Sequence, residues 1–326
     1  MNPRENYMAA IAHQIPEWVP VYARPVRWNV GITDPFEKGP AGGGMDGFGV
    51  LWKDDGFGSC PSSEFYAVTD ITRWREQTTF PDLDSMDWAA KARKELDGAD
   101  RNNCIVEYCM GNGPYERMLA LMGLEALTCA FYEEPEACKD YLDAWADYKI
   151  HHIDLVATHY KPDFISIFDD VAYETGMFVS PTLYREFISP IHKRCNDAIR
   201  SHGILPVQHC CGKAEYLVED FIAEGAVAWS SVQPVNDIVG ILQKYGDRLT
   251  IIGGFDTNGP PARMDATEEM RRAEVRRALD TYAPYGSFII SNLRVTGSTP
   301  EDTRRMSAQC MDEALTYGRS FYQTHR

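Results

Sequence analysis

Short apolar runs alternate with amphipathic stretches along the chain from about residue 103 onward. The apolar runs predict buried strands, and apolar faces that recur every three or four residues predict helices. The predicted strands are residues 104–108, 164–168, 204–207, 227–232, 249–252 and 288–290. The predicted helices are residues 114–130, 135–158, 181–201, 213–224, 237–245, 267–283 and 300–322. Ser180-Pro181 and Thr299-Pro300 each place a capping residue before a proline, which is typical of a helix start.

The first hundred residues are less regular. Asn2 and Pro3 predict the start of a helix, residues 18–22 read as a short strand, and residues 48–52 read as a weaker one. The rest of residues 30–100 is irregular and carries a glycine cluster at residues 39–49. This cluster lacks the Gly-Lys-Ser/Thr ending of a phosphate loop, so we favour a flexible lid or loop over a phosphate cradle.

Strands that alternate with helices indicate a parallel sheet with right-handed crossovers. The six strands after residue 103, together with residues 18–22 and 48–52, make eight. The pattern therefore predicts a single (β/α)8 TIM barrel over residues 1–326, with an N-terminal helix and an irregular segment at 30–100. A doubly wound sheet is the alternative fold.

Composition narrows the range of partners. The chain is 44% hydrophobic and 25% charged, which is typical of a globular protein, and its net charge of −16 disfavours nucleic acid and anionic membranes. Its nine scattered cysteines form no disulfide framework. No apolar run is long enough to span a membrane, and the start has no apolar signal core. We expect a cytoplasmic protein, and a homodimer is compatible with this expectation.

The chemistry of a barrel of this kind lies at the carboxyl ends of its strands. His209 and Cys211 follow one predicted strand and are two residues apart, so both side chains can face one Zn²⁺. A structural histidine beside buried thiols is the alternative. Glu107 stands within an apolar strand, where a carboxylate needs a partner such as a metal or an arginine.

Further polar and aromatic residues lie at or near strand ends. Asp169, Asp170 and Asp256 are candidate general acids or oxygen ligands, although each also suits a turn. Aromatic side chains and one amide are candidates for substrate binding, namely Tyr22, Trp28, Phe48, Trp52 and Asn292. Core packing is the alternative for the aromatic residues. No serine-hydrolase elbow and no clean dinucleotide fingerprint occurs in the sequence.

Several motifs in this order resemble the uroporphyrinogen decarboxylase superfamily. They are Asn2-Pro3-Arg4-Glu5-Asn6-Tyr7, Val19-Pro20-Val21, the run from Asp169 to Pro181, His209-Cys210-Cys211-Gly212-Lys213, Gln233-Pro234 and Gly253-Gly254-Phe255-Asp256. The second half of this set is similar to the corrinoid-linked methyltransferase branch. Residues 46–52 and 80–84 resemble members that demethylate aryl methyl ethers of the veratrol or vanillate type.

The resemblance implies a (β/α)8 barrel, a zinc site that uses His209 and Cys211, and a separate corrinoid protein as methyl acceptor. Thiol-methylating members carry a further zinc-binding cysteine, and its position falls here near Leu293. An oxygen ligand would then complete the metal site, and the sequence does not choose among Glu107, Asp169, Asp170, Glu174 and Asp256. Fewer thiolates leave a stronger Lewis acid, which suits an ether oxygen better than a thiol.

We therefore expect a zinc-dependent methyltransferase that moves a methyl group from an aryl methyl ether to Co(I) of a corrinoid protein. The aromatic residues would hold the ring, and a nearby acid would protonate the released phenolate. The alternatives are a methylcorrinoid:thiol methyltransferase, a metal-free decarboxylase-like lyase that uses Asp169 or Asp170, and a corrinoid-docking barrel without catalysis.

Overall fold

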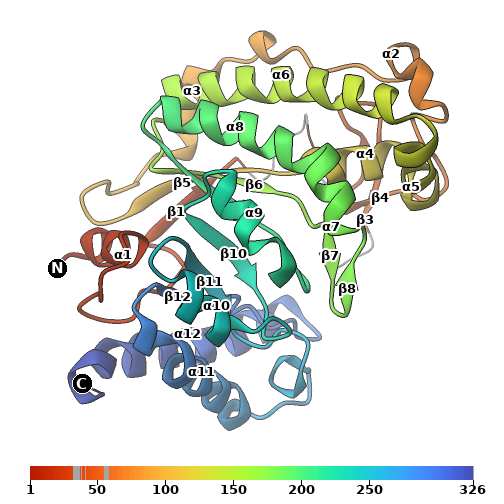
Figure 1. Cartoon of the computed structure of the whole chain (residues 1–326). Coiled ribbons are helices and arrows are strands. Elements are labelled where there is room, and N and C mark those ends of the chain that lie inside the picture. The colour runs from red at the N-terminus through yellow and green to blue at the C-terminus, as the bar shows by residue number, and fades with distance from the viewer. Residues whose placement is uncertain (32–36, 38, 41, 55–58, 326) are drawn as a thin grey trace.

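The computed structural model describes residues 1–31, 37, 39–40, 42–54 and 59–325. Its main sheet has seven parallel strands in the order β1-β5-β6-β9-β10-β11-β12 (Figure 1). They span Arg27–Val30, Ile105–Met110, Phe164–Phe168, Leu205–His209, Ala228–Val232, Thr250–Gly254 and Phe288–Ser291. Six of them match the strands predicted after residue 103, each within two residues at either end.

One chain segment joins the two edges of this sheet. Tyr22 N donates to Ile290 O at 2.9 Å, and Ile290 N donates to Pro20 O at 3.1 Å, so residues 20–22 pair with β12. A few residues later β1 pairs with β5. The predicted strand at 18–22 is therefore reduced to a single bridge, and the ladder strand at 27–30 was missed. The sheet curls into the predicted TIM-barrel-like fold.

Helices cover the outside of the barrel, as a parallel sheet requires, except that the N-terminal helix packs against side chains at the amino ends of the strands. They are α1 (Pro3–Ile11), α2 (Trp74–Gln77), α3 (Trp88–Glu95), α4 (Pro114–Met122), α5 (Leu124–Glu133), α6 (Pro135–His159), α7 (Pro181–Leu183), α8 (Ser189–Ser201), α9 (Val218–Ala223), α10 (Ile238–Tyr245), α11 (Glu268–Tyr282) and α12 (Pro300–Thr324). A π-helical turn at Tyr184–Ile188 joins α7 to α8. Short 3-10 helices lie at Ile71–Arg73, Leu83–Ser85, Glu215–Leu217, Pro260–Ala262 and Ala283–Tyr285.

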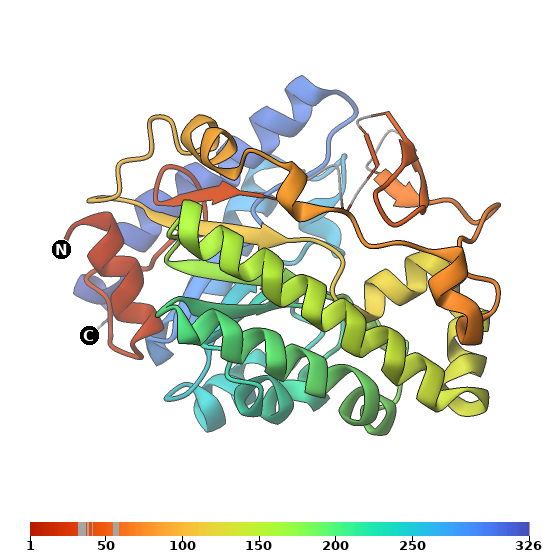
Figure 2. The same cartoon turned by 90° about the horizontal axis from the view of Figure 1, so that it is seen from above.

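The prediction of a barrel strand at 48–52 is wrong. Leu51–Asp54 forms β3 of a separate antiparallel sheet, with β2 (Gly44–Met45) and β4 (Ser59–Pro61) on either side. A hairpin, β7 (Ala172–Tyr173) with β8 (Gly176–Met177), follows β6. Figures 1 and 2 both show the β2–β4 sheet at the end of the molecule opposite the two termini, where the barrel strands end.

Buried charges tie the first hundred residues to the helical layer. Asp46 accepts hydrogen bonds from Phe48 N, Val50 N and Trp52 Nε1, each at 2.9 Å, and pairs with Arg117 of α4 at 2.6 Å. All of these groups are buried, so the four donors together compensate the desolvation of one carboxylate. Among the described residues, every helix is too short or too polar to span a lipid bilayer.

A second buried pair lies nearby, between Glu37 and Lys149 of α6. His152 Nδ1 is 3.6 Å from the same carboxylate. Burial alone would raise the pKa of Glu37, but Lys149 and His152 outweigh it and lower this pKa from 4.5 to about 2. The folded protein therefore releases this proton more readily than the unfolded chain does.

This depressed pKa predicts a pH dependence of stability. The contribution of Glu37 is complete above about pH 5 and is lost as the pH falls toward 2, because the unfolded chain takes up the proton first. Glu37→Gln should lower the free energy of unfolding by about 3–5 kcal/mol at pH 7, since Lys149 stays buried without its carboxylate. Urea denaturation between about pH 7 and pH 3 measures both effects.

The control is Glu301→Gln, at an exposed position of the first turn of α12. This variant should keep the acid-dependent loss of the parent protein. An equally steep loss in Glu37→Gln would contradict the assignment to Glu37.

Candidate functional site

Three different ligand atoms meet at the carboxyl end of the barrel. A carboxylate oxygen of Asp170, a ring nitrogen of His209 and the sulfur of Cys211 all lie within 4.8 Å of one another. The fold brings them together because β6 and β9 are neighbours, and Phe168 of β6 stands opposite His209 of β9. The predicted metal pair is thus brought together, and the third member is Asp170.

Close packing holds this donor group of Asp170, His209 and Cys211. Cys211 N donates to Asp170 Oδ1 at 2.7 Å, and Cys211 Sγ lies 3.8 Å from His209 Nε2. The His209 ring is stacked on Phe168, with 3.7 Å between ring centroids and 4° between planes. Gly212 has a φ of +80°, and a side chain there would lie 2.7 Å from the backbone of the β7–β8 hairpin. Glycine lets this loop pass beneath the hairpin.

The hydrogen bonds of His209 leave Nε2 available as a ligand. Nδ1 is 3.0 Å from Ser230 Oγ, whereas Nε2 lies on the side of Cys211 Sγ, at 3.8 Å, so Nε2 is the ring nitrogen that faces the other donors. Burial lowers the pKa of His209 and so favours the neutral ring that metals bind. One carboxylate, one imidazole and one sulfur form a donor set that suits Zn²⁺.

The Cys211 thiol needs a nearby cation to ionise near neutral pH. Burial and then Asp170 raise the pKa of Cys211 to about 12, so the thiol stays protonated near neutral pH when no cation is bound. A divalent cation bound between the three donors would favour the thiolate. The donor group therefore fits a metal that displaces the thiol proton.

Asp169 faces away from the donor group. It is fully buried, and its carboxylate accepts from Glu116 N at 2.8 Å and from Tyr115 N at 3.3 Å in the first turn of α4. His192 Nε2 of α8 lies 2.9 Å from the same carboxylate. Burial opposes the charge of His192, but Asp169 outweighs it and raises the pKa of this histidine. The structure places Asp169 as the cap of a helix and the partner of a buried histidine.

Glu107 lies outside the donor group. Its buried carboxylate pairs with Arg27, accepts from Tyr22 Oη at 2.8 Å and accepts from Ser166 Oγ. The Arg27 guanidinium lies 3.7 Å from the centroid of the Tyr22 ring, and Nη2 of Arg27 contacts Cys109 Sγ at 3.2 Å. Burial opposes the charge of Arg27, but Glu107 outweighs this and raises the pKa of the guanidinium. Of the two partners that the sequence allowed for Glu107, a metal or an arginine, the structure shows the arginine, Arg27.

Two other polar candidates occupy different places. Asp256 Oδ1 accepts from Gly259 N at 2.8 Å and from Asn258 N at 3.1 Å, which closes a turn after β11. Asn292 lies beside the donor group, because its Nδ2 donates to Ser231 Oγ at 3.4 Å and Ser231 contacts Cys211.

The predicted aromatic wall is divided between several places. Trp28 donates to Glu95 O at 2.8 Å in the direction of α3, and Phe48 is packed against the rings of Phe80 and Tyr148 in the core. Tyr22 is bound to Glu107. Trp52 is the member of this set that lines a cavity beside Asp170.

This cavity, which we name the Asp170 cavity, has a volume of about 320 Å³. Its walls come from the β2–β4 sheet, the end of β5, the start of α4 and the end of β6. They comprise Trp52, Ser59, Cys60, Pro61, Gly111, Asn112, Glu116, Leu119, Ala120, Phe168 and Asp170. Its volume is at the lower end of the range for small-molecule sites, which is about 300–1,000 Å³. It suits a small ligand with an aromatic or apolar body.

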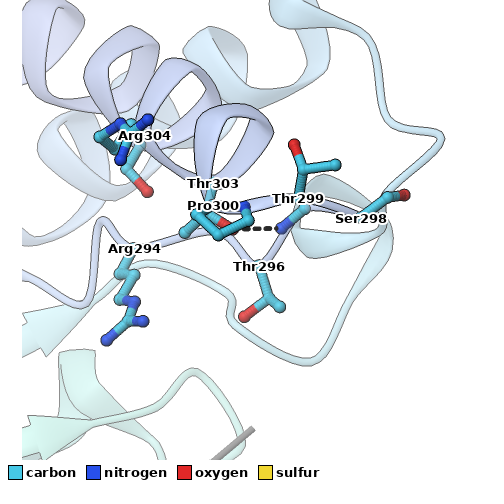
Figure 3. Close-up of a pocket in the computed structure, with 9 residues that line it drawn as sticks. Arg294, Thr296, Ser298, Thr299, Pro300, Thr303 and Arg304 are labelled. Carbon is cyan, nitrogen blue, oxygen red and sulfur yellow. Dashed lines mark hydrogen bonds between the residues drawn. The ribbon is translucent and has the colours of Figure 1, made fainter. Parts of the chain in front are cut away.

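A larger cavity of about 930 Å³ lies between the loop after β12 and the start of α12 (Figure 3). Arg294 and Thr296 of the loop and Arg304 of α12 are among its walls, and Gly297 N donates to Thr303 Oγ1 at 2.9 Å across it. Its lining residues include no histidine, cysteine or carboxylate. The Asp170 cavity, which does contain a member of the donor group, is therefore the better candidate for a reacting ligand.

Several residues of the site were missed in the sequence. Phe168, which stacks on His209, and Ser230 and Ser231, which contact His209 and Cys211, all stand at strand ends. Two consecutive serines at the end of an apolar strand are the signal that was available for the latter pair. Glu116 is in the first turn of α4, and its sequence context carries no such signal.

Comparison with known proteins identifies the family. The profile described as uroporphyrinogen decarboxylase (URO-D) matches residues 65–312, and the chain belongs to this family. No curated protein matches the sequence.

Among solved structures, the fold is similar to a methyltransferase from Methanosarcina mazei. The TM-score is 0.65 at 14% identity over 97% of this chain and 100% of that one. A D-allulose 3-epimerase from Methylomonas sp. matches with a TM-score of 0.35 at 13% identity over 69% of this chain and 91% of that one, a likeness too low to carry an argument.

The neighbours Asp169 and Asp170 should respond differently to substitution. Asp169→Ala should lower the free energy of unfolding by about 3–5 kcal/mol, because His192 and the start of α4 lose a buried carboxylate. Asp170→Ala should cost about 1 kcal/mol in the metal-free protein, since one hydrogen bond to Cys211 N is lost, and should abolish zinc uptake. Urea denaturation and metal analysis of both variants separate the two roles. Zinc loss at unchanged stability in Asp169→Ala would contradict this assignment.

Glu107→Gln tests the other predicted metal ligand. The amide keeps the shape of the side chain but leaves the buried guanidinium of Arg27 without its counter-charge. We expect a loss of about 3–5 kcal/mol in the free energy of unfolding, with zinc binding of the folded protein retained. The reverse result, in which zinc is lost and stability is unchanged, would establish Glu107 as a ligand.

Proposed function

We propose that this protein is a zinc-dependent methyltransferase that moves a methyl group from an aryl methyl ether to the Co(I) of a corrinoid protein. The observation that carries the proposal is the group of Asp170, His209 and Cys211 at the barrel mouth, beside a cavity with two aromatic walls. The likeness of the fold to a methyltransferase supports the same class of reaction.

Asp170, His209 and Cys211 would hold the zinc ion, which supplies a Lewis acid for the ether oxygen. Trp52 and Phe168 would bind the aromatic ring in the Asp170 cavity, with Leu119 and Ala120 completing an apolar wall. Phe168 also keeps the His209 ring in place by stacking on it. Glu116 lines the same cavity and would hold the proton that the released phenolate takes up.

The overall reaction balances without a further oxidant or reductant. The electron pair of Co(I) forms a bond to the methyl carbon while the bond from that carbon to oxygen breaks. The oxygen keeps the electrons of the broken bond and takes up a proton, which gives a phenol and methyl-Co(III). The corrinoid arrives on a separate protein, so the barrel mouth must admit it.

Two features favour this reaction over the alternatives. Arg27, which could otherwise bind the carboxylates of a porphyrinogen, is paired with Glu107, and Asp169 is occupied by α4 and His192. The donor group of the described residues contains a single sulfur and one carboxylate, which leaves a bound cation more Lewis acidic than a site of several thiolates would.

Metal analysis and a methyl-transfer assay test the proposal together. Untagged protein purified with zinc supplied should contain about one zinc per chain, whereas His209→Ala and Cys211→Ala should contain almost none. With 1,2-dimethoxybenzene as the probe ether, the zinc-loaded protein should convert free cob(I)alamin to methylcobalamin, followed by absorbance. The two variants should be inactive.

Cys210→Ala is the matched control, because Cys210 is adjacent and buried but lies outside the donor group. It should keep both zinc and activity. Wild-type protein that takes up no zinc would refute the metal site. Zinc binding without methyl transfer from any aryl methyl ether would refute the substrate class, and release of CO₂ from a porphyrinogen would favour the lyase.

A further inference from the structure

The end of β10 contains an irregularity directly beside the donor group. Ala228, Trp229 and Ser230 pair in regular register with Thr250, Ile251 and Ile252 of β11, but the next pair is Val232 with Gly253. Ser231 is therefore an extra residue, and its φ of +68° lies in the left-handed region. A side chain at Gly253 would collide with the backbone of Val232, so this glycine makes room for the bulge.

The bulge turns two consecutive side chains toward one site. Neighbouring residues of a regular strand point to opposite faces, yet Ser230 and Ser231 each contact a member of the donor group. Ser230 Oγ lies 3.0 Å from His209 Nδ1, and Ser231 Oγ lies 3.1 Å from Cys211 Sγ. His209 and Cys211 therefore each have their own serine partner.

A second left-handed residue supports Ser231. Asn292, at the end of the neighbouring segment after β12, has a φ of +64° and donates from Nδ2 to Ser231 Oγ at 3.4 Å. This bond uses one lone pair of the Ser231 oxygen and leaves its hydroxyl proton able to reach Cys211 Sγ, and a thiolate at Cys211 can only accept. Left-handed conformations of residues other than glycine are strained and cluster at functional sites. Here two of them lie in one hydrogen-bonded chain that ends on a donor atom.

We propose that Ser231, supported by Asn292, is a positioning residue that donates a hydrogen bond to the Cys211 thiolate and thereby limits the charge that the sulfur gives to a bound cation. This inference rests on the metal site of the proposed function. A thiolate that accepts a hydrogen bond is a weaker electron donor, so the cation keeps more of its Lewis acidity for the ether oxygen. Ser230 has a different task, because it orients the ring of His209.

Cobalt substitution tests this role without any turnover. Co²⁺ bound to a thiolate gives a sulfur-to-metal charge-transfer band in the near ultraviolet, whose energy falls as the sulfur becomes richer in electrons. Ser231→Ala should shift this band to longer wavelength, because the sulfur then gives more of its charge to the cation. Asn292→Gly removes the supporting amide, relieves the left-handed strain and should shift the band in the same direction by less.

Ser230→Ala is the matched control. This variant removes the hydroxyl that contacts His209 instead of the one that contacts Cys211. Zinc affinity should therefore fall, while the sulfur-to-metal band stays in place. An unshifted band in both Ser231→Ala and Asn292→Gly, with cobalt bound as in the wild type, would overturn this inference and leave the metal site standing. Failure of the wild-type protein to bind Co²⁺ or Zn²⁺ would instead overturn the proposed function and this inference with it.

Discussion

The ion pair between Glu107 and Arg27 sits where the barrel is least regular, and the closure of the sheet depends on it. The first strand is interrupted, with residues 20–22 on β12 and residues 27–30 on β5. The Glu107 carboxylate contacts Tyr22 from the first piece, Arg27 from the second and Ser166 from β6. One buried charge thus joins the chain segments across the gap, and its desolvation is compensated only when all of them are in place.

The order of the strands in the sheet sets the geometry of the candidate site. With the sheet curled, the carboxyl ends of β6, β9 and β10 lie side by side, and the ligand atoms of Asp170, His209 and Cys211 converge although the residues are up to 41 positions apart. Their supports come from the same neighbours, since Phe168 ends β6 and Ser230 and Ser231 lie in β10. The site is therefore built from strand ends, with the Asp170 cavity added by the β2–β4 sheet and α4.

The features that could be predicted from the sequence are those that follow from local periodicity. The strands after residue 103 were found because short apolar runs bounded by helices are unambiguous, and the His209–Cys211 pair was found because alternate residues share a face. The prediction of a barrel strand at residues 48–52 was wrong, because an apolar run does not determine which sheet the strand joins. Asp169 and Asp170 could not be told apart, since their separation depends on α4 and α8, which pack there from elsewhere in the chain. The bulge at Ser231 also depends on a neighbour, Gly253.

The two adjacent aspartates have a consequence for how this scaffold can change in evolution. Asp169, which holds α4 and α8 together, and Asp170, which belongs to the donor group, are separate residues, so a mutation can remove one role without the other. Glu107, too, is a residue separate from the donor group, and its carboxylate is paired with Arg27. The residues of the donor group can therefore vary on this scaffold without loss of the buried contacts that hold α4 and α8.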